Sequence, residues 1–136
     1  MVTYLLKKSY QHKTLKEVNF KDLWGDRGVF TTMRILGKPT KIIFFKEHIK
    51  NLVKSLKIYK LDRVNIEKDI LKLIKLNINK NKYYNHLLRV AVNNKMVSIS
   101  LRNRKTPKLN FNLGVFLSLK EIEIIFLFKA TLRRWL

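Results

Sequence analysis

Residues 23–55 pass from a tight turn to strand-like and then helix-like spacing. A Gly-Asp-Arg-Gly turn at 25–28 leads into the alternating run at 29–35, which predicts a strand. Gly37 and Pro39 break the chain, and the apolar run at 42–45 predicts a second strand. From Glu47 onward, apolar residues recur every three or four positions, which predicts a helix. This order of elements constrains the fold more than any other part of the sequence.

The rest of the chain adds strands and one more helix. A first strand is expected at 2–6, and the polar residues 10–16 predict either a loop or a second edge strand. Asn65 stands where a helix begins, and five apolar residues after it share one face: Ile66, Ile70, Leu73, Ile74 and Ile78. The runs at 86–92 and 96–101 predict a hairpin, and further strands are expected at 113–117 and 122–128. Strands joined by hairpins, with two helices grouped between them, predict an α+β fold with a mostly antiparallel sheet.

Length and composition limit the classes of protein that fit. A chain of 136 residues has room for one core, so we expect a single domain over 1–136. Cysteine is absent, which excludes disulfides and thiolate sites, and the three histidines lack metal-ligand spacing. No metal site is expected. Neither a run of 18 apolar residues nor a secretory signal is present. We therefore expect a cytoplasmic protein with no membrane span.

The formal net charge of +21 raises the question of an anionic partner. Lysine accounts for most of the excess and is spread evenly along the chain, which favours a solvated surface over a dedicated basic patch. A nucleic-acid-binding module, with Trp24, Tyr83 or Tyr84 stacking on bases, is the less favoured hypothesis, because no recognition-module motif is present.

The segment around the turn resembles the N-terminal half of the class IV, fold-type IV pyridoxal-phosphate enzymes. These are the branched-chain and D-amino-acid aminotransferases and aminodeoxychorismate lyase. The residues that carry the resemblance are Asp22, Gly25, Asp26, Gly28, Phe30, Thr32, Arg34, Glu47, His48, Leu52 and Ser55. Two residues depart from the pattern: Arg27 is inserted in the turn, and Asn51 replaces an arginine that helps to hold the cofactor phosphate. The resemblance implies the fold of that family's N-terminal domain, pyridoxal phosphate as cofactor and an amino-acid or amino-deoxy substrate. For a full-length form it also implies a homodimer.

Lys129 is the predicted catalytic and cofactor-binding lysine. It follows the most apolar run of the chain, 124–128, and a desolvated site favours the neutral amine that must attack the cofactor aldehyde. The sequence FKATLRRWL around it also resembles the cofactor-lysine segment of the family. Asn51 would face the cofactor phosphate, but a neutral amide cannot make the charge-assisted hydrogen bonds of an arginine.

Arg89 and Arg34 are the predicted substrate-binding residues, because an arginine on a strand can hold a carboxylate with two parallel hydrogen bonds. The alternative for each is a strand-edge arginine that faces water. The family's second domain, which supplies most of the phosphate donors, is expected to be absent from this sequence. Three hypotheses follow: the N-terminal portion of an aminotransferase or of an aminodeoxychorismate lyase-like enzyme, an inactive truncated remnant, and the less favoured nucleic-acid-binding module.

Overall fold

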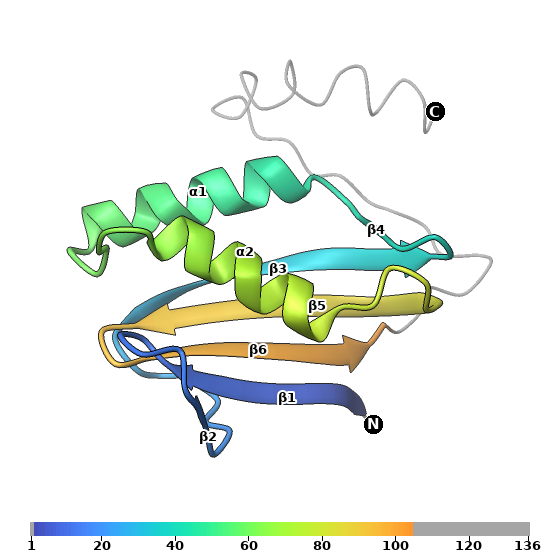
Figure 1. Cartoon of the computed structure of the whole chain (residues 1–136), viewed down its shortest axis with the longest axis horizontal. Coiled ribbons are helices and arrows are strands. Elements are labelled where there is room, and N and C mark those ends of the chain that lie inside the picture. Colours follow the sequence, from blue (N-terminus) through green and yellow to red (C-terminus); the bar gives the residue numbers. More distant parts are fainter. Residues whose placement is uncertain (1, 105–136) are drawn as a thin grey trace, which may run out of the picture. The chain divides into compact units, whose positions relative to one another are not determined.

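The computed structural model describes residues 2–104, which form a six-stranded sheet and two helices (Figure 1). In chain order the elements are β1 (Tyr4–Gln11), β2 (Glu17–Val18), β3 (Gly28–Gly37), β4 (Lys41–Ile42), α1 (Phe45–Ile58), α2 (Ile66–Asn77), β5 (Tyr84–Asn93) and β6 (Met96–Asn103). The strands lie in the order β2-β1-β6-β5-β3-β4, and all neighbours are antiparallel. The predicted α+β class is confirmed. The strands expected at 113–117 and 122–128 lie outside the described residues, and the single domain over 1–136 stays a prediction.

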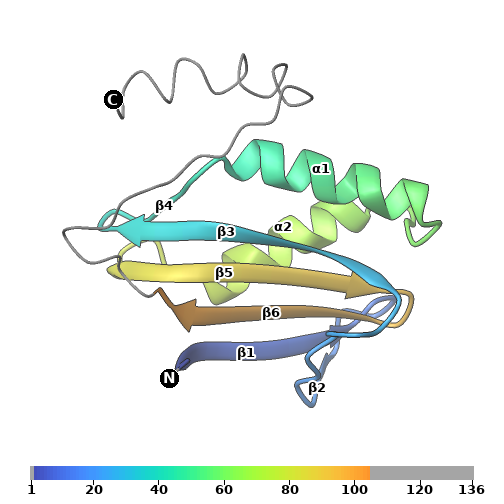
Figure 2. The ribbon, with the colours of Figure 1, turned by 180° about the vertical axis from the view of Figure 1, so that it is seen from behind.

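Both helices cover one face of the sheet, and the other face carries no helix within residues 2–104 (Figures 1 and 2). Side chains alternate between the two faces of a strand. Met33 and Ile35 of β3 and Leu88 and Val90 of β5 therefore point to the helices and are fully buried. Leu56 of α1 closes the core from the other side. The sheet thus has one face committed to packing and one face open for other contacts.

The predicted hairpin at 86–101 is confirmed. Val92 pairs with Val97 across its end, and the side-chain oxygen of Asn93 accepts hydrogen bonds from the backbone N–H groups of Lys95 and Met96 at 2.8 and 2.7 Å. An asparagine side chain that binds the backbone two or three residues further on is a common way to close a turn. The hairpin is therefore held by its own first turn residue.

Three predicted boundaries differ from the structure. The first strand runs over Tyr4–Gln11 rather than 2–6, because β6 provides backbone partners along its whole length. Of the two alternatives for 10–16, the loop is correct for 12–16, and the short edge strand follows it at Glu17–Val18. The apolar run at 42–45 does not continue as a strand: Phe44 has a left-handed backbone with φ of 50°, and α1 begins at Phe45. Phe45 belongs to the helix because it lies one turn before the buried Ile49.

The second helix follows its predicted pattern closely. It begins after Asn65, and all five apolar residues predicted to share a face are buried. The side chain of Asn65 makes no capping hydrogen bond, and its backbone is left-handed with φ of 66°. The tolerance of asparagine for this conformation, rather than a side-chain cap, explains its place before the helix.

A polar cluster between the β1 end and α2 includes the buried His12, which is 5% exposed. Arg63 donates a hydrogen bond from Nε to Nδ1 of His12 at 3.3 Å and also forms an ion pair with Asp69. Burial, and then the positive charge of Arg63, lower the pKa of His12 below its usual value, against the opposing effect of Asp69. Neutral His12 is therefore part of the folded state.

Mild acid is expected to destabilise the fold through His12. Below about pH 6.5 the histidine of the unfolded chain takes up a proton, whereas buried His12 resists it, so the free energy of unfolding should fall by up to about 1.4 kcal/mol per pH unit. Urea unfolding between pH 7.5 and 5 measures this loss. In His12→Gln the slope should be reduced. The same slope in His12→Gln as in the parent chain would show that His12 is not the cause.

Candidate functional site

The loop at 19–27 is fixed to the open face of the sheet by two buried serines. Ser9 of β1 and Ser98 of β6 are register partners, and their hydroxyl oxygens lie 2.7 Å apart. The backbone N–H of Lys21 donates to the Ser9 hydroxyl at 3.0 Å, and the Ser98 hydroxyl donates to the carbonyl of Lys21 at 2.8 Å. The residues that follow Lys21 are thereby held over the face that the helices leave free.

Arg89 projects from the same face in the middle of β5. Its Nη1 donates a hydrogen bond to Oδ1 of Asp22 at 3.0 Å. Its guanidinium carbon lies 5.3 Å from the ring centroid of Trp24 and 4.8 Å from that of Phe30, within the range of cation–π attraction. One carboxylate and two aromatic rings therefore hold the guanidinium in one place.

These contacts do not occupy all the hydrogen-bond donors of the Arg89 guanidinium. Its side chain is 19% exposed, and the buried Nε has no hydrogen-bond partner among residues 2–104. Leaving a buried donor unpaired costs about 1–3 kcal/mol. Because an arginine carries five N–H donors in a planar fork, its Nη groups can offer a carboxylate further hydrogen bonds beside the one to Asp22, whereas Nε is buried.

A cavity of about 340 Å³ lies beside Arg89, between the turn at 23–28 and the strands β3 and β5. Gly28 permits the close approach of the two strands: a Cβ atom there would lie 2.5 Å from the carbonyl oxygen of Val92. Trp24 and Phe30 also line the cavity and are 73% and 55% exposed. Among the lining residues of the described part of the chain, Arg89 is the only cation, and the only carboxylate, Asp26, forms an ion pair with Lys21. The arrangement can bind a small anion with an apolar or aromatic body.

Comparison with protein families decides where this fold belongs. The family model described as "Amino-transferase class IV" matches residues 28–122, well over half of the chain. The chain belongs to the class IV aminotransferase family. No curated protein and no solved structure matches it. The match includes Arg34, Asn51 and Arg89, begins after Asp22 and ends before Lys129.

The structure of this class IV aminotransferase domain separates the two predicted substrate arginines. Arg89 pairs in register with Thr32, and Arg34 follows Thr32 by two residues, so both arginines point to the open face. Arg34 is exposed and does not line the cavity, whereas Arg89 does. Only Arg89 is brought together with other residues of the cavity, and the role of Arg34 stays a prediction.

Asn51 lies on the exposed side of α1, away from the helical residues that enter the core. One turn earlier, Nδ1 of His48 is hydrogen-bonded to the hydroxyl of Thr31 at 2.8 Å, which ties α1 to β3. His48 thus joins a helix to a strand. Asn51 does not line the Arg89 cavity, so its assignment to the cofactor phosphate also stays a prediction.

Class IV aminotransferases in general depend on pyridoxal phosphate. The predicted cofactor lysine, Lys129, lies outside the described residues. Within residues 2–104, no helix is long and apolar enough to cross a membrane. Among the same residues, no three histidine, aspartate or glutamate side chains gather as a group that could hold a metal ion.

Two contributions to the site were not predicted. Asp22 was recognised as part of the resemblance but given no role, and the structure makes it the ion-pair partner of Arg89. Trp24 was considered only as a base-stacking residue, and the structure places its ring against the guanidinium. Both residues lie in the segment that leads into the turn. Loops between strands commonly carry binding residues, so this position could have indicated a role for both.

Proposed function

We propose that the chain forms the substrate-carboxylate side of a pyridoxal-phosphate-dependent active site. Arg89 binds the carboxylate of an amino-acid substrate. The observation that carries this proposal is the guanidinium that lines a 340 Å³ cavity and is held from one side by Asp22. A substrate carboxylate would accept two parallel hydrogen bonds from the guanidinium of Arg89.

Each neighbour of Arg89 has a role in this proposal. Asp22 is a positioning residue, because it orients the guanidinium by a hydrogen bond and does not itself line the cavity. The rings of Trp24 and Phe30 form the apolar side of the cavity mouth, where an apolar substrate side chain would pack against them. Positioned groups of this kind reduce the entropy that a bound substrate must lose before it reacts.

The described residues fit the cofactor only in part. Asn51, in the position of the family's phosphate-binding arginine, is neutral and exposed, and no lysine among residues 2–104 lines the Arg89 cavity. When bound, pyridoxal phosphate supplies an electron sink for negative charge at the substrate α-carbon. We propose that Lys129 attaches it, and that most of the phosphate donors come from outside residues 2–104.

Two reactions suit this site. Amino-group transfer on a branched-chain or D-amino acid is one, and carbon-carbon bond cleavage of the aminodeoxychorismate lyase type is the other; membership of the family is compatible with both. In both, Arg89 would bind a carboxylate while the reacting bonds lie on the cofactor side. As the resemblance implies for a full-length form, the proposed active form is a homodimer, and the cytoplasm is its proposed location.

An inactive member of the family is the second candidate, and Asn51 is the residue that favours it. A neutral, exposed amide at the phosphate position weakens the hold on the cofactor, because charge-assisted hydrogen bonds are about twice as strong as neutral ones. Such a protein would keep the fold and the Arg89 cavity without turnover.

Labelling of Lys129 tests the active against the inactive proposal. The full chain is mixed with an equimolar amount of pyridoxal phosphate, reduced with borohydride and analysed by peptide mass mapping. We expect a label on Lys129 that saturates at one per chain, because a desolvated amine reacts before solvated surface lysines. The variant Lys129→Arg should show only scattered label. An even distribution over surface lysines in the parent chain would contradict the active proposal and support the inactive one.

A further inference from the structure

The two helices leave a groove on the face of the molecule opposite to Arg89. Helices α1 and α2 diverge from the loop at 59–65 that joins them, so they are close at one end and apart at the other (Figures 1 and 2). A hollow of about 740 Å³ lies between them. A second hollow, of about 310 Å³, shares the residues Phe45 and Leu71 with the first and continues toward Ile42 of β4. The two hollows are therefore neighbours along the helix pair, and together they are called the groove below.

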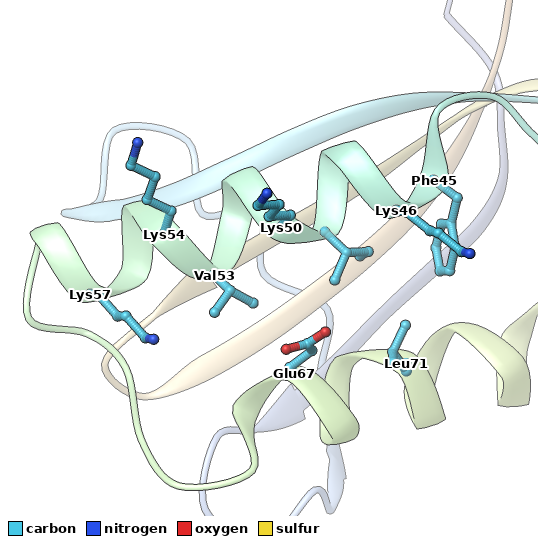
Figure 3. A pocket seen from close by; sticks show the side chains of 9 residues that line it. Phe45, Lys46, Lys50, Val53, Lys54, Lys57, Glu67 and Leu71 are labelled. Carbon is cyan, nitrogen blue, oxygen red and sulfur yellow. The ribbon is translucent and has the colours of Figure 1, made fainter.

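The floor of this groove is apolar. Phe45, Ile49 and Val53 line it from α1, and Leu71 lines it from α2. Figure 3 shows Val53 and Leu71 pointing into the space between the helices. Apolar side chains in a concave surface favour a partner with apolar side chains of its own, because their contact removes both surfaces from water.

The rim of the groove is cationic. Lys46, Lys50, Lys54 and Lys57 line it, and their spacing of four, four and three residues places one on each successive turn of α1. Figure 3 shows Lys50 and Lys54 pointing away from α2 and Lys57 pointing toward it. Glu67 is the only acidic residue among the described residues that line it. Four of the lysines that are spread along the sequence therefore form a row of positive charges beside the apolar floor of the groove.

We propose that this groove binds an acidic amphipathic helix of a partner protein. Apolar side chains on one face of such a helix would fill the floor, and carboxylates beside that face would pair with the lysine row. The 14 residues of α1 span about 21 Å, so a partner helix of three to four turns matches the length of the row.

Other occupants fit the charges and the floor less well. A second copy of this chain would bring a formal charge of +21 to a cationic rim. Residues 105–136 of the chain itself carry six basic and two acidic side chains. A nucleic acid would contact the lysines through its phosphates but would leave the apolar floor uncovered. An acidic amphipathic helix satisfies both parts of the groove.

Binding of a synthetic peptide to the full chain tests this inference. The probe is a fluorescein-labelled peptide of about 15 residues with leucines at helical spacing and glutamates beside them, followed by fluorescence anisotropy. A peptide of the same composition in scrambled order measures binding by charge alone. We expect saturable binding of the amphipathic peptide, at least tenfold tighter than that of the scrambled one, and weaker binding at higher salt.

Two double variants with equal charge changes locate the site. Lys50 and Lys54 line the groove, whereas Lys68 and Lys72 are exposed on α2 and do not line it. The variant K50E/K54E should weaken binding at least tenfold, and K68E/K72E less than threefold, with unchanged circular dichroism in both. Equal loss in the two variants, equal binding of the scrambled peptide, or no saturable binding would overturn the proposal.

Binding of a nucleic acid or of a second copy of the chain in the groove would give different results in the same experiment. A single-stranded oligonucleotide that displaces the peptide and loses affinity in K50E/K54E alone would overturn the proposal in favour of a nucleic acid. A dimer in sedimentation that K50E/K54E dissociates would overturn it in favour of a second copy. Because Arg89 lies on the other face of the sheet, neither result bears on the proposed substrate site.

Discussion

Replacing Arg89 by alanine is expected to weaken the binding of an amino-acid carboxylate by about 100- to 10,000-fold. The reason is the loss of charged hydrogen bonds, each worth about 1.5–3 kcal/mol, from a guanidinium that Asp22 and two aromatic rings already hold in place. Arg89→Lys keeps the charge but not the planar fork, so an intermediate loss is expected. The dissociation constant, measured by calorimetry on the cofactor-loaded full chain, gives the result.

The control for Arg89→Ala is a second arginine on the same face of the sheet. Arg102 of β6 pairs in register with Leu87 of β5, two residues before Arg89, and does not line the cavity. Arg102→Ala removes the same charge and should change the affinity less than threefold. An equal loss in both variants would mean that carboxylates respond to the net charge of the face, and the assigned role of Arg89 would be wrong.

Replacing Leu88 by alanine is expected to lower the free energy of unfolding by about 2–5 kcal/mol. Leu88 precedes Arg89 on β5, points to the helices and is 0% exposed, so its removal leaves a cavity in the core. Urea unfolding of the full chain measures the change. The matched control is Leu76→Ala on α2, whose side chain is 70% exposed, and the expected change there is within about 0.5 kcal/mol. A comparable loss in both variants would contradict the assigned core.

Much of the fold could be predicted because its pattern is local. The alternation in 29–35 predicts β3, the five apolar residues after Asn65 predict the buried face of α2, and the two runs around 93–95 predict the hairpin. The first strand was predicted too short because its apolar pattern stops at Lys7 and Lys8, before the buried Ser9. Its burial depends on Ser98 and on the backbone of Lys21, which are distant in the sequence.

The sequence could predict which residue types form the candidate site, but not which of these residues contact one another. Arg89 could be proposed from its strand and from the family resemblance. Its ion pair with Asp22 joins residues 67 positions apart, and no local pattern encodes such a contact. Arg34 and Arg89 also look equivalent in the sequence, since each is an arginine on a strand. Only the register of β3 and β5 and the position of the turn place one beside the cavity and the other in solvent.

The measurement that tests the central claim most directly is an NMR titration that observes the Nε–H group of Arg89. The labelled full chain, with pyridoxal phosphate present, is titrated in turn with L-leucine and D-alanine. If Arg89 binds the substrate carboxylate, its Nε–H resonance should shift saturably, together with the indole N–H of Trp24, whose ring lies against the guanidinium. A saturable response elsewhere in the chain with no change at Arg89 would contradict the proposed site.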